Sequence, residues 1–473
     1  MNLRDRQILH IALPSIVSNI TVPLLGLVDV AIVGHMGSAV YIGAVAVGSM
    51  IFNLVYWLFA FLRMGSSGLT AQAWGRRDMP ETVGILVRAV LIALLIALLL
   101  LVLQVPLCRL MFWLIEPTPD VLPLASTYFY MVIWGAPASL CLFVLTGWFI
   151  GMQNTRFPML VSILQNVVNI LVSLSLVYGL GMKIEGVALG TVVAQYVGLL
   201  VAAGLLWRYY GKILGKQKRI STLPFFNSSI LPFFNSSILP FFHSSILQSF
   251  HSSILQSFNP SILQFKIYRD LFLRTLCLVA VNLFFTAVGA RQGAVVLSVN
   301  TVLLQMYLFF SYFMDGFAYA GEALGGKTYG ARNMQAFRET LRHLWLWMVI
   351  VTGAFTLLYI IGGMQVVEAL TDDADVRQSA ADFIFWAWLV PASGCVAFIW
   401  DGVFVGITAT RGMLVSSFVA AIVFFTICCI PSAFHLPSST VNHFLWLAQV
   451  VYLSMRGIVQ TVWYRLKLSK LVN

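Results

Sequence analysis

Charged residues are scarce in this 473-residue chain. Asp, Glu, Lys and Arg make up only 10% of it, whereas a soluble globular domain carries about 25%. Hydrophobic residues make up 60%, which is more apolar surface than a water-soluble fold of this length could bury. The composition therefore excludes a soluble protein and predicts an all-α polytopic membrane protein that has the lipid bilayer as a partner.

The cysteines lack any pattern of a disulfide framework or a zinc site. No two of them stand in CxxC spacing, and most lie inside apolar runs. We therefore expect buried, unreactive thiols. The six cysteines are Cys108, Cys141, Cys277, Cys395, Cys428 and Cys429.

Motifs of membrane-embedded catalysis are also missing. The chain contains no HExxH, no GxSxG and no Cys–His pair within an apolar run, so we expect no enzyme. One stretch, GEALGGKT at 321–328, formally fits the pattern of a phosphate-binding loop. Such a loop follows a strand, whereas this stretch ends an apolar run, so we expect no ATP binding.

Long apolar runs predict about twelve membrane spans. Each of these runs lacks Asp, Glu, Lys and Arg and can supply a helix of roughly 20 residues, the length that crosses a bilayer. They cover 30–62, 89–107, 121–155, 157–182, 186–207, 292–314, 343–367 and 412–455, and shorter runs cover 7–28, 275–290 and 383–400.

Basic residues mark one side of the membrane. The clusters at 76–88, 208–274, 327–342 and 456–470 fall on alternate loops, so the positive-inside rule predicts cytoplasmic termini in a multi-pass protein of the cell membrane. The net charge of +11 then reflects topology, and we expect no nucleic-acid partner. In this interpretation Arg63 is the only cation inside a span.

The sequence contains an internal duplication. Gly75 and Arg77 recur as Gly330 and Arg332, and the same offset of 255 recurs far along the chain. Because this offset crosses an even number of spans, the halves share one orientation and predict two parallel six-helix lobes. The second set pairs Gly147, Phe149, Gly151, Thr155 and Arg156 with Gly402, Phe404, Gly406, Thr410 and Arg411.

These patterns divide the chain into an N-terminal lobe at 1–219, a cytoplasmic linker at 220–268 and a C-terminal lobe at 269–473. The linker contains an octapeptide repeat at 223–262, with copies such as LPFFNSSI. Eight residues leave each copy rotated by about 80° on a helix, so no constant face results. We expect a disordered or loosely membrane-associated segment.

Several segments resemble the MATE (multidrug and toxic compound extrusion) family, and within it the DinF branch. They are SNITVPLLGLVDVAIVGHMG at 18–37, LRMGSSGLTAQAWG at 62–75, NVVNI at 166–170, GVALGT at 186–191, MDGFAYAGEALGGKTYGAR at 314–332 and WDGVFVG at 400–406.

The resemblance covers nearly the whole chain except the octapeptide insert. It implies a twelve-helix antiporter that exports cationic or amphipathic small molecules in exchange for protons or sodium. We expect a monomer with no cofactor, with Na⁺ as a possible coupling ion.

An acidic residue in the first span is the principal candidate for coupling. Asp29 stands five residues before Gly34, about 7.5 Å along a helix axis, so it lies within the span. A proton and a cationic substrate would compete for this carboxylate. The resemblance implies that Asp29 is protonated during transport and that Pro23 bends the same helix.

The resemblance also implies a polar network in the first lobe. Asn169 and Thr191 match family positions that hydrogen-bond around the aspartate. Ser173 is a departure, because related sequences commonly carry a second aspartate there. A hydroxyl holds no charge, so protonation of Asp29 is favoured over a two-carboxylate sodium site.

Three acids form a second-lobe candidate site for ions or substrate. Asp315 and Glu322 are seven residues apart, which predicts one helix face, and Asp401 lies on another span. Glu322 has an alternative interpretation, a structural pair with Lys327.

The preferred interpretation is a proton-coupled exporter. The alternative on the same general fold is a flippase for lipid-linked precursors. A flippase needs a basic cavity, and Arg63 as the only inner cation argues against polyanionic cargo.

Overall fold

A computed structural model describes residues 2–34, 39–216, 245–434 and 438–468. Within these ranges, only the backbone is described at 22–31, 33–34, 39, 214–216, 245–260, 432, 438–439 and 468. Every element in the described part of the chain is a helix, which confirms the predicted all-α class.

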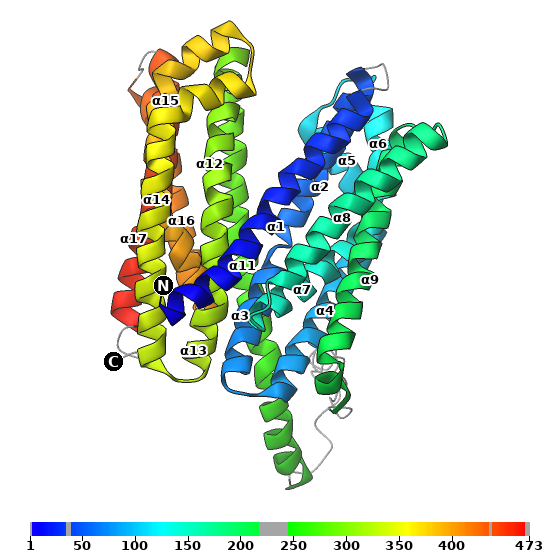
Figure 1. Cartoon of the computed structure of the whole chain (residues 1–473), viewed down its shortest axis with the longest axis vertical. Helices are drawn as coiled ribbons and strands as arrows, with labels where there is room; N and C mark the ends of the chain where they lie inside the picture. Colours follow the sequence, from blue (N-terminus) through cyan, green and yellow to red (C-terminus); the bar gives the residue numbers. More distant parts are fainter. Residues whose placement is uncertain (1, 35–38, 217–244, 435–437, 469–473) are drawn as a thin grey trace.

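The helices form two lobes that lie side by side in Figure 1. The first lobe holds α1 (Leu3–Gly34), α2 (Ala39–Leu58), α3 (Phe61–Gly75), α4 (Met79–Val102), α5 (Gln104–Ile115), α6 (Leu122–Val132), α7 (Ala136–Gly151), α8 (Arg156–Leu174) and α9 (Ile184–Lys216). The second holds α11 (Ser245–Arg291), α12 (Ala294–Ala320), α13 (Gly326–Gly330), α14 (Met334–Leu370), α15 (Ala374–Gly406), α16 (Thr410–Ala433) and α17 (Ser438–Trp463).

The number of spans agrees with the prediction. Ten helical stretches in the described chain are long and apolar enough to cross a membrane, some of them made of two consecutive helices such as α2 and α3. α1 and α17, with 32 and 26 residues, complete six spans in each lobe. The stretch at 321–328 continues α12 through a π-helical turn into α13, so it lacks the strand that a phosphate loop requires.

The duplication is visible in how equivalent helices begin. Asp78 caps α4 by accepting a hydrogen bond from the Glu81 amide, and Asn333 caps α14 by accepting one from the Ala336 amide. The residues before these caps, Arg77 and Arg332, both have a positive φ, of 60° and 54°. The two halves of the sequence therefore form the same turn, once before α4 and once before α14.

Glycines permit the close helix crossings inside each lobe. A Cβ at Gly147 would lie 2.2 Å from the carbonyl oxygen of Arg63, where α7 crosses α3. A Cβ at Gly402 would lie 2.1 Å from the carbonyl oxygen of Ala318, at the equivalent crossing of α15 and α12. Both contacts are with backbone, so only glycine fits at either crossing.

The lobes meet at the end of the molecule that carries Arg76, Arg77 and Arg332, which we name the basic end. A Cβ at Gly75 would lie 2.1 Å from the Lys327 carbonyl oxygen, and one at Gly330 would lie 2.3 Å from that of Gln72. These two contacts are equivalent under the offset of 255. The helices of the two lobes spread apart toward the opposite end, at the top of Figure 1.

Polar contacts between the lobes reinforce this end. Gln72 donates to the Thr408 hydroxyl at 3.0 Å, and Lys327 donates to the Gln153 amide oxygen, also at 3.0 Å. These contacts are again related by the repeat. The side chains that close the basic end therefore come in equivalent pairs from the two lobes.

The N-terminal turn of α1 crosses to the second lobe. Asp5 accepts hydrogen bonds from His343 at 2.8 Å and from the Trp347 indole at 3.1 Å, both on α14. The His343 contact is the main cause that holds the pKa of Asp5 below its ordinary value of 3.8. Arg4 also lies 3.4 Å from Glu339 of α14.

Two sequence expectations are modified here. Residues 245–268 of the expected linker belong to α11, because the lack of one apolar face does not prevent a helix from forming. The remaining repeat copies, at 223–244, lie outside the described residues, and the lobe boundaries stay a prediction. Cys108, Cys141 and Cys395 are buried as expected, but Cys429 is exposed, since the outer face of a span contacts lipid.

Candidate functional site

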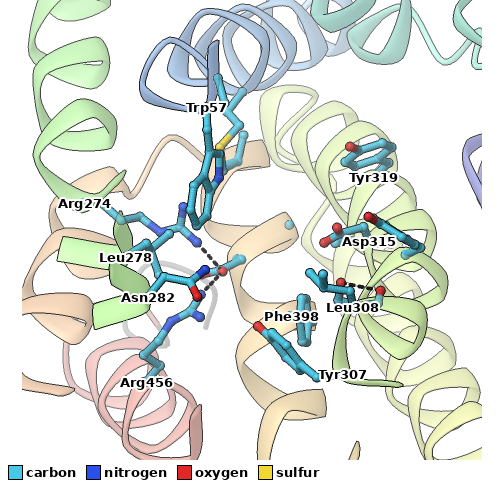
Figure 2. Close-up of a pocket in the computed structure, with 18 of the residues that line it drawn as sticks. Trp57, Arg274, Leu278, Asn282, Tyr307, Leu308, Asp315, Tyr319, Phe398 and Arg456 are labelled. Atoms are coloured by element: carbon cyan, nitrogen blue, oxygen red, sulfur yellow. Dashed lines mark hydrogen bonds and ion pairs between the residues drawn. The ribbon is translucent and has the colours of Figure 1, made fainter. Parts of the chain in front are cut away.

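A cavity of about 390 Å³ lies between the lobes and is the principal candidate site. Trp57, Arg63 and Met64 line it from the first lobe, and residues of α11, α12, α15 and α17 line it from the second. Figure 2 shows Trp57 approaching the second-lobe side chains. Three arginines and three acids line the cavity, so its formal charge is balanced: Arg63, Arg274, Arg456, Asp315, Glu322 and Asp401.

Asp401 lies at the centre of a buried ionic cluster. One of its carboxylate oxygens accepts hydrogen bonds from both Arg274 of α11 and Arg456 of α17. Its other oxygen accepts a hydrogen bond from Gln460 at 2.6 Å. The structure therefore places this predicted site residue in the cavity wall, where two guanidinium groups compete for one carboxylate oxygen (Figure 2).

The cluster corrects our expectation that Arg63 is the only cation inside a span. The sequence pattern places Arg274 and Arg456 in cytoplasmic clusters, but Arg274 lies in the middle of the span 261–291 and Arg456 lies within α17. They are only 6% and 4% exposed. A count of basic residues per loop fails here because a buried carboxylate pairs with both arginines inside the membrane.

Glu322 forms an ion pair with Arg63 rather than with Lys327. The guanidinium lies 3.6 Å from the Glu322 carboxylate, which is nearly fully buried. Arg63 also stacks over the Tyr319 ring at 4.3 Å. The alternative pairing with Lys327 is therefore wrong, since that ammonium donates to Gln153 across the lobe interface.

Asp315 lines the same cavity as Glu322, in agreement with the predicted common helix face. Among the side chains that the structure describes, no ion pair or hydrogen bond to the Asp315 carboxylate is present. It is the one of the three cavity acids that lacks a guanidinium partner within this described part. Its carboxylate is consequently available to a proton or to a cationic group of a substrate.

The predicted polar network of the first lobe is present in part. Asn169 donates to the Thr191 hydroxyl at 3.1 Å, and Ser173 donates to the Asn169 carbonyl oxygen at 3.3 Å. Gly190 permits the close approach of α9, since a Cβ there would lie 2.1 Å from the Ser173 hydroxyl. A second cavity of about 380 Å³ adjoins Asn169 and Thr191.

Pro23 and Asp29 fall within the backbone of α1, but their side chains lie outside the described part of the structure. Their roles therefore stay predictions. The described side chains hold no group of three or more His, Cys, Asp or Glu that could bind a metal ion. Sodium as a coupling ion also stays a prediction.

Sequence reasoning missed Arg274, Arg456 and Gln460. A signal for Arg456 was present, because it stands within the apolar stretch VVYLSMRGIVQTVW rather than beside other basic residues. Arg274 is likewise followed at once by the apolar run of its span. The pairing with Asp401 could not be read from the sequence, since the partners are 127 and 55 residues away.

Comparison with known proteins identifies the family. The MatE family model matches residues 14–175 and 271–430, which lie in the two lobes. DNA damage-inducible protein F of Escherichia coli K12 is 35% identical over 466 residues, which cover 98% of this chain and 92% of that protein. A protein named a probable multidrug resistance protein, NorM of Acinetobacter baylyi, is 27% identical over 43% of this chain and 46% of its own.

Solved structures agree with the fold. The crystal structure of a MATE protein in the bent conformation superposes with a TM-score of 0.79 and covers 99% of this chain and 96% of its own, at 17% identity. With the family model matched over most of both lobes and a relative 35% identical over nearly the full length, the chain belongs to the MatE family of multi-pass membrane transporters, in its DinF branch.

Proposed function

We propose that this transporter exports cationic or amphipathic small molecules in exchange for protons. The observation that carries the proposal is the cavity between the lobes, where the carboxylate of Asp315 faces open space without a cationic partner in the described part of the chain. A half-buried carboxylate of this kind, in the wall of a cavity, binds either a proton or a cation, and competition between the two is the minimum chemistry of antiport.

Alternating access would come from rocking of the two lobes. The reciprocal contacts of Gly75 with Lys327 and of Gly330 with Gln72 support a state closed at the basic end. By the positive-inside rule this end faces the cytoplasm, together with both termini, in the cell membrane. The state described is then open away from the cytoplasm, and we propose that a monomer suffices.

Two residues would couple transport to protons, Asp29 in the first lobe and Asp315 in the second. The resemblance to the family supports Asp29, and the cavity geometry supports Asp315. Asp401 is a weaker candidate than its position in the sequence suggests, because two arginines already neutralise it. Coupling to sodium is the alternative, and the experiment must distinguish it from coupling to protons.

The test is transport of a fluorescent cationic dye in proteoliposomes under an imposed pH gradient, with and without sodium. We expect gradient-driven transport in the wild type and a loss of about tenfold or more in Asp29→Asn and in Asp315→Asn, because an amide cannot carry the proton. Asp372→Asn is the matched control, since Asp372 is fully exposed.

Transport that requires sodium but no pH gradient would overturn proton coupling. Undiminished transport in Asp315→Asn, with Asp29→Asn inactive, would restrict coupling to the first lobe and overturn the second-lobe part of the proposal.

A flippase for lipid-linked precursors is the second candidate, and the buried Arg274 and Arg456 favour it more than the sequence suggested. The three acids of the cavity still balance its three arginines, whereas polyanionic cargo requires an excess of positive charge. Flipping of a fluorescent lipid diphosphate without dye transport would support this candidate over the exporter.

A further inference from the structure

We propose that Arg274 and Arg456 form a subsite for an anionic group, such as a carboxylate, on an amphipathic substrate. The inference rests on the proposed function only in treating the cavity as the transport site. It names a substrate class that the cationic expectation omits, and its evidence comes from the second-lobe wall of the cavity.

The charges of the cluster are unequal. Two guanidinium groups share the single carboxylate of Asp401, which leaves one positive charge without a partner. All three residues are buried. Removal of a charge from water is costly unless it is paired. Among the described side chains, neither of the other two acids of the cavity pairs with this extra guanidinium group, because Glu322 pairs with Arg63 and Asp315 forms no ion pair. An incoming anion would supply the missing charge.

Hydrogen-bond donors are also in excess. A guanidinium carries five N–H donors, but the structure describes one hydrogen bond from Arg274 and one from Arg456, both to the same oxygen of Asp401. The Nε of each arginine and the hydroxyl of Tyr452 are buried and have no described partner. Both arginines line the cavity, and the fork of N–H donors on a guanidinium group fits the two oxygens of a carboxylate.

The rest of the cavity fits an apolar body. Leu278, Phe398 and Trp57 line it beside the arginines. Figure 2 shows Arg274 and Arg456 on one side of the pocket and Asp315 on the other. An amphipathic compound can therefore place its anionic group against the arginines and its apolar part against the aromatic and aliphatic walls.

The experiment compares two probes that differ only in charge. Dansyl-phenylalanine carries a free carboxylate, and dansyl-phenylalaninamide carries a neutral amide on the same fluorescent body. Equilibrium binding to the purified full-length protein in detergent, without any gradient, is measured by dansyl fluorescence. The acid should bind at least about tenfold more tightly, because hydrogen bonds to a charged group are stronger than neutral ones.

Two variants change the cluster charge in opposite directions. Arg456→Gln should weaken binding of the acid by about tenfold or more. Asp401→Asn should strengthen it, because both guanidinium groups lose their internal anion. Neither variant should change the affinity for dansyl-phenylalaninamide by more than about twofold. Arg109→Gln, which lies outside this cavity, is the control for total charge.

Equal affinities of the acid and the amide in the wild type would overturn the proposal. Weaker binding of the acid by a folded Asp401→Asn variant would also overturn it. A cluster with only a structural role predicts that both variants bind both probes more weakly. Thermal unfolding checks that each variant is folded. Binding measured without a gradient is independent of proton coupling, so an absence of proton-driven transport would leave this test intact.

Discussion

At the scale of single residues, the account depends on a few positions where packing leaves no freedom. Gly147 and Gly402 lie against backbone carbonyls of Arg63 and Ala318, so each fixes how a cavity-lining helix crosses its neighbour. Arg63 itself forms one of these crossings. Asp315 stands three residues before Ala318, which forms the other. The position of the charged side chains is therefore set by glycines that take no part in the chemistry.

Gly147→Ala should destabilise the protein by about 1–3 kcal/mol, because overpacking against backbone cannot be relieved by a side-chain rotation. Gly204→Ala is the matched control, since a Cβ there meets nothing within 4 Å. The control should be neutral or stabilising by up to about 1 kcal/mol through helix propensity. Thermal unfolding in detergent measures both, and an equal effect of the two substitutions would contradict the packing argument.

Residue types and their spacing were sufficient to predict the three acids of the cavity, but not their ion-pair partners. Asp315, Glu322 and Asp401 were found because an acid in an apolar run is unusual. The partners were not found, because ion pairs such as Arg63 with Glu322 depend on how distant helices cross. Arg274 and Arg456 were counted with basic clusters, although each adjoins an apolar run that marks it as part of a span.

At the scale of elements, α1 connects the two lobes at the basic end. Its first turn contacts α14 through Asp5, His343 and Trp347. Apolar length predicted this helix as a span, but its contact with the second lobe follows from its direction through the molecule, which Figure 1 shows as diagonal. The periodicity of apolar residues in the sequence cannot predict the direction in which α1 crosses the molecule.

The Asp5 contact should make stability depend on pH. The pKa of Asp5 is lowered in the fold, so its contribution is complete above its ordinary value of 3.8 and is lost as pH falls through the lower folded value. Asp5→Asn should therefore lower the unfolding temperature at neutral pH, and its difference from the wild type should shrink below about pH 4. A difference that is constant with pH would rule out the charged contact as its source.

At the scale of the whole molecule, the internal duplication explains both the fold and the closure. The offset of 255 predicted two parallel lobes, and the same offset relates Gly75 to Gly330 and Gln72 to Lys327 in the contacts between them. The sequence could not show that these residues meet across the lobe interface, since a repeat implies symmetry without specifying which surfaces touch.

Gly75→Leu should shift the lobes toward separation at the basic end, because its side chain would meet the Lys327 backbone. Spin labels at Arg77→Cys and Arg332→Cys, on a background without native cysteines, report the distance across the interface. We expect a longer-distance population in Gly75→Leu and none in Gly204→Leu. An unchanged distance distribution would show that this contact does not hold the closed state.

The central claim is that a substrate and a proton compete within one cavity. The most direct measurement is proton release on addition of the cationic dye to purified protein in weakly buffered, sodium-free detergent solution. We expect release in the wild type that rises with bound dye and falls in Asp315→Asn, while Asp372→Asn behaves as the wild type does. Dye binding without proton release in the wild type would contradict the account.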